Sequence, residues 1–179
     1  MFYSFSLVLI VPVVSNFWHI RNALSELPKI YLSVNRKEKF EGAGLHLTVD
    51  EFEAIGPMGG ICSWLRKCQE DALLVTASDM PFVSKEIVAQ LLHQYEEKQV
   101  LTVVVADGRA QPLLGVYPKR ILPVLEGLIS EGDYRLCQVI ELVDHVLVEL
   151  PEGNLSTQNI NTPDEYAAIR QSDSKETMR

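Results

Sequence analysis

Short runs of apolar and β-branched residues alternate along this chain with longer segments in which apolar residues recur at helical spacing. The clearest run is Leu-Leu-Val-Thr-Ala at residues 73–77. Continuous runs of this kind are typical of strands that are covered on both faces. Alternating helices and buried strands therefore predict an α/β domain with a mostly parallel, doubly wound sheet. In such sheets ligands bind beyond the carboxyl ends of the strands, so the residues that follow each strand are the candidates for function.

The periodicity predicts the elements in a definite order. Strands are expected at residues 30–34, 45–49, 73–77, 101–105, 113–117 and 146–150. Helices are expected at residues 16–27, 61–68, 120–130 and 134–143, in a segment capped by Ser84 and in one that starts at Thr162-Pro163. With 179 residues, 47% of them hydrophobic, the chain has the size of a single domain. We expect an atypical N-terminal segment at 1–15, the domain at 16–171 and a flexible tail at 172–179.

The segment 1–15 is apolar and contains no glycine, lysine or arginine. The apolar stretch Phe2–Val14 has no basic residue before it and is shorter than the ~20 residues of a membrane-spanning helix. Three interpretations stay open: a weak signal peptide, a buried β-strand, and sequence left from a truncated or misread start.

Charge and cysteine content restrict the partners. The formal net charge of −8 argues against a partner bound through nucleic-acid phosphates, and it suits a site that holds a cation. The cysteines form no C-x-x-C pair, which indicates buried free thiols, and the four histidines are too scattered for a metal site. We expect a cytoplasmic protein with no nucleic-acid or membrane partner. The cysteines are Cys62, Cys68 and Cys137.

Asp79 is the strongest candidate for chemistry. It follows the run 73–77 directly, so it lies where the predicted strand ends, and Pro81 then forces an extended exit. A carboxylate in this place is suited to holding a hard divalent cation against the phosphates of a ligand. The alternative is that Asp79 only caps a turn.

A glycine-containing turn, Gly56-Pro57-Met58-Gly59-Gly60, leads into the predicted helix at 61–68. Gly59 and Gly60 would allow the backbone to approach a ligand at the positive end of that helix. A simple tight turn is the alternative. Asp50, which follows the strand at 45–49, either accepts hydrogen bonds from a base edge or is solvated.

Two further groups of polar residues lie next to predicted strands. Asn159 and Asn161 stand before the capped helix at Thr162, and their amides are able to reach ions or phosphates. Gln111 and Pro112 precede the strand at 113–117, where a plain turn is the favoured interpretation. No serine or cysteine has the context of a nucleophile, so the expected chemistry is positioning and charge neutralisation.

Four segments together resemble the molybdenum cofactor guanylyltransferase family. The order and separations of these segments agree with the family, and the resemblance extends from about residue 16 to 169. It implies a Rossmann-like, three-layer nucleotidyltransferase fold and the transfer of GMP from GTP to molybdopterin, with release of pyrophosphate and with Mg²⁺ as cofactor. It also implies contact with other proteins of molybdenum cofactor synthesis. The segments are Ser33-Val34-Asn35-Arg36, Gly56–Gly60, Ser78-Asp79-Met80-Pro81 and Asn159–Glu165.

The resemblance also implies roles for individual residues. Asp79 would be the catalytic residue that holds the metal and faces the nucleotide. The guanosine side would consist of Asn35, Asp50, Pro57, Gly59 and Gly60. The pterin side would consist of Gln111, Pro112, Asn159 and Asn161.

The chain departs from the family at its start. Members open with a strand and a loop of the form L-A-G-G-x-S-x-R-M-G-x-D-K, and residues 1–15 do not match it. We therefore expect the first strand and phosphate loop to be missing or replaced, with residues 1–14 partly substituting for the strand, and catalysis to be weakened. The alternatives are a non-catalytic nucleotide- or pterin-binding protein, and a cytidylyltransferase or sugar nucleotidyltransferase on the same fold.

Overall fold

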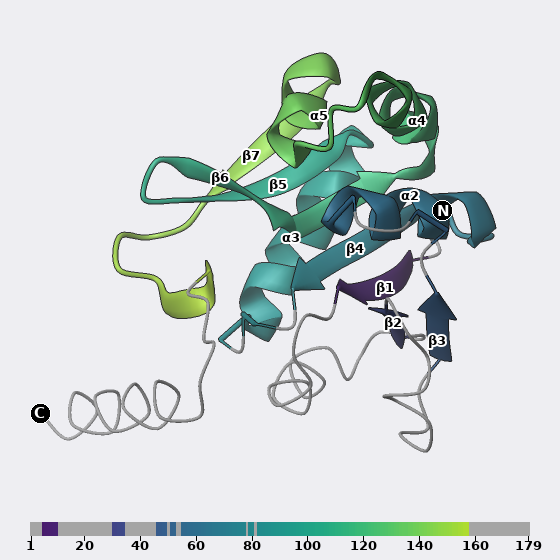
Figure 1. Cartoon of the computed structure of the whole chain (residues 1–179). Helices are drawn as coiled ribbons and strands as arrows, with labels where there is room; N and C mark the ends of the chain where they lie inside the picture. The colour runs from purple at the N-terminus through teal and green to yellow at the C-terminus, as the bar shows by residue number, and fades with distance from the viewer. Residues whose placement is uncertain are drawn as a thin grey trace, which may run out of the picture.

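The computed structural model describes residues 5–10, 30–34, 46–49, 51–52, 55–77, 79–80 and 82–157. The helices expected at 16–27 and after Thr162 lie outside these residues. The described strands form one seven-stranded sheet in the order β3-β2-β1-β4-β6-β5-β7 (Figure 1). Their bounds are β1 Phe5–Ile10, β2 Ile30–Val34, β3 His46–Val49, β4 Ala72–Ala77, β5 Leu101–Ala106, β6 Arg109–Pro118 and β7 His145–Glu149.

The sheet is mostly parallel, as the sequence predicts. Neighbouring strands are parallel except at β6, which runs antiparallel to both β4 and β5. The apolar N-terminal stretch forms β1, a central strand that pairs with β2 from Leu7 and with β4 from Phe5. The strand interpretation of this stretch is therefore confirmed for Phe5–Ile10, which lies between β2 and β4 in the sheet.

Helices cover both faces of the sheet. The bounds are α2 Pro57–Lys67, α3 Lys85–Lys98, α4 Leu122–Glu131 and α5 Leu136–Leu142, with short 3₁₀ turns η2 Lys119–Ile121 and η3 Leu155–Thr157. Strand β4 shows the two faces, because side chains alternate along a strand. Leu74 packs with α3, whereas Leu73 and Val75 pack with α2, α4 and α5 (Figure 1). The result is the three-layer α/β arrangement that the sequence predicts.

The predicted helix caps are correct where the structure describes them. The Ser84 hydroxyl accepts a hydrogen bond from the Ile87 N–H at 3.4 Å, which caps α3. The helix expected at 120–130 is divided into η2 and α4, because Pro123 stands in the first turn of α4 and cannot continue a helix from η2. The helix expected at 134–143 is shorter and begins at Leu136.

Gln111 and Pro112 do not form the turn that the sequence favours. They lie inside β6, in a β-bulge: Val103 of β5 is opposite Gly115, but Val104 is opposite Gln111. Pro112 has no N–H to donate, so a bulge is one of the few places where it fits in a sheet. The buried Tyr117 hydroxyl donates a 2.6 Å hydrogen bond to the Pro112 carbonyl and fixes the bulge.

The thiols are free, but one is not buried. Cys62 and Cys68 lie in the core, and burial raises the pKa of Cys62 to about 11, so this thiol is not a ready nucleophile. Cys137 is exposed, which corrects the expectation of three buried thiols. The reason is its position on α5, whose inward face is formed by Leu136, Val139 and Ile140.

Candidate functional site

The candidate residues that the structure describes lie at the carboxyl edge of the parallel strands. Asp79 follows the end of β4. The turn at Gly56 lies at the same edge, because α2 must carry the chain from the carboxyl end of β3 back to the start of the parallel strand β4. Strand β6 runs the opposite way and therefore begins at this edge, with Leu114 opposite Thr76. Gln111 lies three residues nearer the edge than Leu114.

Asp79 is held with one carboxylate oxygen enclosed. Its side chain is half-buried, and Oδ1 is inaccessible to solvent and has no hydrogen-bond partner within the described part of the chain. Burial raises the pKa of Asp79 above its ordinary value, and a hydrogen bond from its own backbone opposes this change. An enclosed oxygen without a partner is costly, and a cation beside it would remove the cost.

The surroundings of Asp79 fit a cation that takes most of its ligands from elsewhere. Across the described ranges, no group of three His, Cys, Asp or Glu side chains lies close enough together to hold a metal ion. Mg²⁺ does not require such a group, because it usually keeps one or two carboxylates and completes its six positions with phosphate oxygens and water. A single carboxylate at a phosphate site is therefore compatible with Mg²⁺.

The structure explains why glycine occupies two positions of the segment 56–60, without any ligand. Gly56 is the N-cap residue of α2 and adopts φ 70°, a conformation that favours glycine. Gly59 is buried, and a Cβ there would lie 2.8 Å from Cγ1 of Ile55 and 3.1 Å from Cβ of Phe52. The preceding loop thus packs where the side chain of Gly59 would be. The close approach at Gly59 is made by the chain itself.

A cavity of about 540 Å³ lies at the same edge, between the start of β6 and η3. Gln111, a predicted pterin-side residue, lines it together with Arg109, Asn154 and Thr157. The buried Ser156 hydroxyl donates to the Phe82 carbonyl at 2.9 Å, which joins η3 to the loop that follows Asp79. The structure therefore brings Gln111 and Asp79 to one region of the edge.

Four predicted site residues lie outside the described residues. Asn35 and Asp50 come directly after β2 and β3, which end at Val34 and Val49. Asn159 and Asn161 come shortly after Thr157.

Sequence reasoning did not select Arg109, Asn154 and Thr157, which line the cavity. A signal for Arg109 was present: Asp107-Gly108 separates two predicted strands, and Asp-Gly is a strong hairpin signal. Both residues have positive φ, 49° and 71°, and form the turn between β5 and β6. A hairpin at this point would have placed Arg109 at the edge of the sheet.

Known proteins resemble this chain in sequence. Residues 15–149 match the family described as the MobA-like NTP transferase domain. A probable molybdenum cofactor guanylyltransferase of Clostridium perfringens strain 13 is 30% identical over 155 residues, which cover 82% of this chain and 78% of the relative. One of Aquifex aeolicus is 29% identical over 82% of this chain and 72% of the relative. With one of Flavobacterium johnsoniae, 30% identical, the match spans 62% of this chain and 58% of the relative's length.

Solved structures share the fold. The molybdopterin-guanine dinucleotide biosynthesis protein A of Archaeoglobus fulgidus superimposes with a TM-score of 0.77 at 20% identity, over 95% of this chain and 99% of the other. The 2-C-methyl-D-erythritol 4-phosphate cytidylyltransferase of Thermus thermophilus gives 0.66 at 15% identity, over 89% and 95%. None of the helices in the described part of the chain has the length and hydropathy needed to cross a bilayer.

Proposed function

The chain belongs to the MobA-like NTP transferase family, and from this we propose that it transfers GMP from GTP to the phosphate group of molybdopterin and releases pyrophosphate. Several of its curated relatives carry the name molybdenum cofactor guanylyltransferase. The observation in the structure that carries the proposal is the enclosed Oδ1 of Asp79 at the carboxyl end of β4, which has no hydrogen-bond partner among the described residues. In an α/β sheet this is the position in which a carboxylate meets a bound ligand.

In the proposed site the two substrates lie on either side of Asp79. The guanosine of GTP lies towards β2, β3 and the start of α2, where it contacts Asn35, Asp50, Pro57 and Gly60. Gly59 is left out of these contacts, because Phe52 and Ile55 fill the space beside it. Molybdopterin lies towards the start of β6. Its contacts there are Gln111, Pro112, Asn159 and Asn161, and the cavity of about 540 Å³ has the size of a small-molecule site.

The proposed reaction is a direct displacement at phosphorus. A phosphate oxygen of molybdopterin forms a bond to the α-phosphorus of GTP, the bond from that phosphorus to the bridging oxygen breaks, and pyrophosphate leaves with the electron pair. Mg²⁺, when bound, neutralises the negative charge on the phosphates. Asp79 in its ionised form would hold the metal, and Arg109, which lines the cavity, would bind the anionic acceptor. No covalent intermediate with the chain is required.

The test is a transfer assay with GTP, molybdopterin and Mg²⁺, in which the dinucleotide product and pyrophosphate are both measured. We expect Asp79→Asn to lower the turnover about 100-fold or more, the size typical for loss of one electrostatic group at a transferring centre. Asp144→Asn is the matched control, because Asp144 precedes β7 and so lies at the opposite edge of the sheet. If transfer occurs with CTP but not with GTP, the chain is a cytidylyltransferase and the proposal is wrong.

A non-catalytic role in binding is the second candidate, and a specific observation favours it. Residues 1–15 contain no glycine, lysine or arginine, and phosphoryl transfer depends on cationic groups around the phosphates. A chimaera in which a strand and loop of the form L-A-G-G-x-S-x-R-M-G-x-D-K replace residues 1–15 separates the two roles. The binding role is supported if the wild-type chain and the chimaera both bind GTP but only the chimaera transfers GMP. Absence of GTP and molybdopterin binding in calorimetry would reject it.

A further inference from the structure

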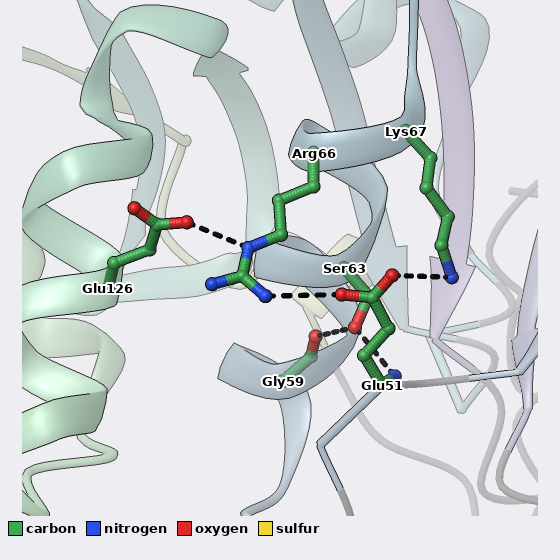
Figure 2. A network of polar contacts seen from close by, with 6 residues as sticks. All are labelled: Glu51, Gly59, Ser63, Arg66, Lys67 and Glu126. Carbon is green, nitrogen blue, oxygen red and sulfur yellow. Dashed lines mark hydrogen bonds and ion pairs between the residues drawn. The ribbon is translucent and has the colours of Figure 1, made fainter.

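The loop between β3 and α2 is fastened to α2 through the backbone of Glu51. The Glu51 N–H donates to the Ser63 hydroxyl at 2.9 Å, and this hydroxyl donates to the Gly59 carbonyl at 2.7 Å (Figure 2). Ser63 is fully buried in α2. One buried hydroxyl therefore joins the loop to the first turn of the helix.

The side chain of Glu51 makes a second attachment at the other end of the helix. Its two carboxylate oxygens accept separately, Oε1 from Lys67 Nζ at 3.0 Å and Oε2 from Arg66 Nη1 at 3.2 Å (Figure 2). The Arg66 guanidinium also lies over the ring of Phe52, 4.9 Å from its centroid. The hydrogen bonds from Lys67 and then Arg66 hold the pKa of Glu51 below its usual range, so it is ionised at neutral pH.

Phe52 and Ile55 of the same loop pack tightly against the first turn of α2. Phe52 and Ile55 lie in the space that a side chain at Gly59 would occupy. The loop is thus held by packing at Gly59, by a buried hydrogen bond at Ser63 and by ion pairs at the last turn of α2.

This set of contacts is poorly explained by stability alone. The ion pairs of Glu51 are largely exposed, and exposed ion pairs contribute little to the free energy of unfolding. Their stronger effect is local, because they restrict a loop that would otherwise sample several conformations. The restricted loop lies at the carboxyl edge, next to the start of α2.

We propose that Glu51 is a positioning residue for base recognition: it holds the described part of the β3–α2 loop, residues 51–52 and 55–56, on α2 in the arrangement that distinguishes guanine from other bases. The inference rests on the proposed function, in which the guanosine of GTP lies at this loop. Glu51 itself does not contact the nucleotide in this proposal. It acts through the backbone that it fixes.

The test compares the affinities for GTP and CTP, measured by calorimetry with Mg²⁺ on the full chain. Glu51→Gln should weaken GTP binding about five-fold, the effect of losing roughly one kilocalorie of loop ordering, and leave CTP binding unchanged. Ser63→Ala removes the hydroxyl that joins Glu51 to Gly59 and changes no charge. It should also lower the ratio of the GTP affinity to the CTP affinity. Glu126→Gln is the matched control, because Glu126 accepts from Nε of the same Arg66 at 2.7 Å but lies on α4.

The affinity ratio separates positioning from general damage, because a loss of fold weakens both nucleotides together. A lower preference for GTP in Glu51→Gln and Ser63→Ala, with an unchanged preference in Glu126→Gln, supports the inference. An unchanged ratio in Glu51→Gln, or an equal loss in Glu126→Gln, overturns it. If the wild-type chain itself shows no preference for GTP, the proposed function fails first, and that result is distinct from a failure confined to Glu51.

Discussion

At the scale of the residue, Asp79 combines a cost in stability with a position directly after the carboxyl end of β4. Its pKa is raised by burial, so the folded state holds the carboxyl proton to a higher pH than the unfolded chain, whose ordinary value is 3.8. Between those two values the unfolded state loses its proton first, and stability falls as the pH rises. Above the folded pKa the whole cost is present.

Asp79→Asn should consequently raise the melting temperature at pH 7 while it lowers GMP transfer. The gain should shrink as the pH falls towards 3.8, because the wild-type carboxyl is then protonated and carries no charge to bury. Thermal unfolding of both proteins over this pH range measures the difference. A lower melting temperature of the variant at pH 7 would show that the carboxylate has a favourable partner in the free protein, contrary to its enclosed Oδ1.

Arg109 is a second residue whose effect can be isolated. It is exposed at the start of β6 and lines the cavity of about 540 Å³, so we expect it to bind the anionic end of molybdopterin. Arg109→Gln should raise the KM for molybdopterin about tenfold, typical for one charge-assisted hydrogen bond, and leave the KM for GTP unchanged. Arg120→Gln is the control, since Arg120 follows the far end of β6. If both variants change the KM for molybdopterin equally, Arg109 does not bind molybdopterin.

At the scale of the element, the β5–β6 hairpin depends on one glycine. A Cβ at Gly115 would lie 2.5 Å from the Thr102 carbonyl oxygen on β5. Because that obstacle is backbone, Gly115→Ala should destabilise the fold by about 1–3 kcal/mol, in the range of overpacked cores. Gly127→Ala should do the reverse, by about 0.5–1 kcal/mol, since a Cβ there meets nothing within 4 Å and the residue lies inside α4.

Urea unfolding of the two alanine variants checks both signs in one experiment. Equal stabilities of the Gly115 and Gly127 variants would mean that β5 and β6 can separate without loss, and the bulge at Pro112 would then not be rigid enough to position Gln111.

The sequence predicted those elements whose pattern is local. The buried run at 73–77 indicated β4, and the Ser84 cap indicated the start of α3. The place of Asp79 after the end of β4 followed directly from the predicted strand at 73–77, and this inference needs no tertiary contact. The bulge at Pro112 was not predicted, because it depends on the pairing of β6 with two neighbours at once and on a hydrogen bond from Tyr117.

At the scale of the whole molecule, the sequence did not decide the structure of the N-terminal stretch, because that depends on strand pairing. The apolar stretch Phe2–Val14 is compatible with a signal peptide or a strand, and the choice follows from the pairing of β1 with β2 and β4. Likewise, the glycine pair at Gly59-Gly60 suggested room for a ligand, whereas Gly59 accommodates the side chains of Phe52 and Ile55. Both points depend on contacts between residues far apart in the sequence, which a local pattern does not reveal.

The proposed site also predicts how ligands change the stability of the whole chain. If Mg²⁺ removes the cost of the Asp79 charge and GTP takes up the remaining positions of the metal, the two ligands should stabilise the fold together more than the sum of their separate effects. At about 100 times the dissociation constant a ligand contributes roughly 2.7 kcal/mol, which corresponds to a rise of about 5–10 °C for a domain of this size. Thermal unfolding with GTP, with Mg²⁺ and with both measures this coupling.

In Asp79→Asn the GTP-dependent part of the shift should lose its dependence on Mg²⁺, because the carboxylate that links the metal to the fold is gone. The Asp144→Asn control should behave like the wild type. If the melting-temperature shifts caused by GTP and by Mg²⁺ simply add in the wild-type chain, the two ligands bind independently of each other. The carboxylate at the end of β4 would then be a local feature of the turn, and the chemistry would have to be sought elsewhere along the carboxyl edge.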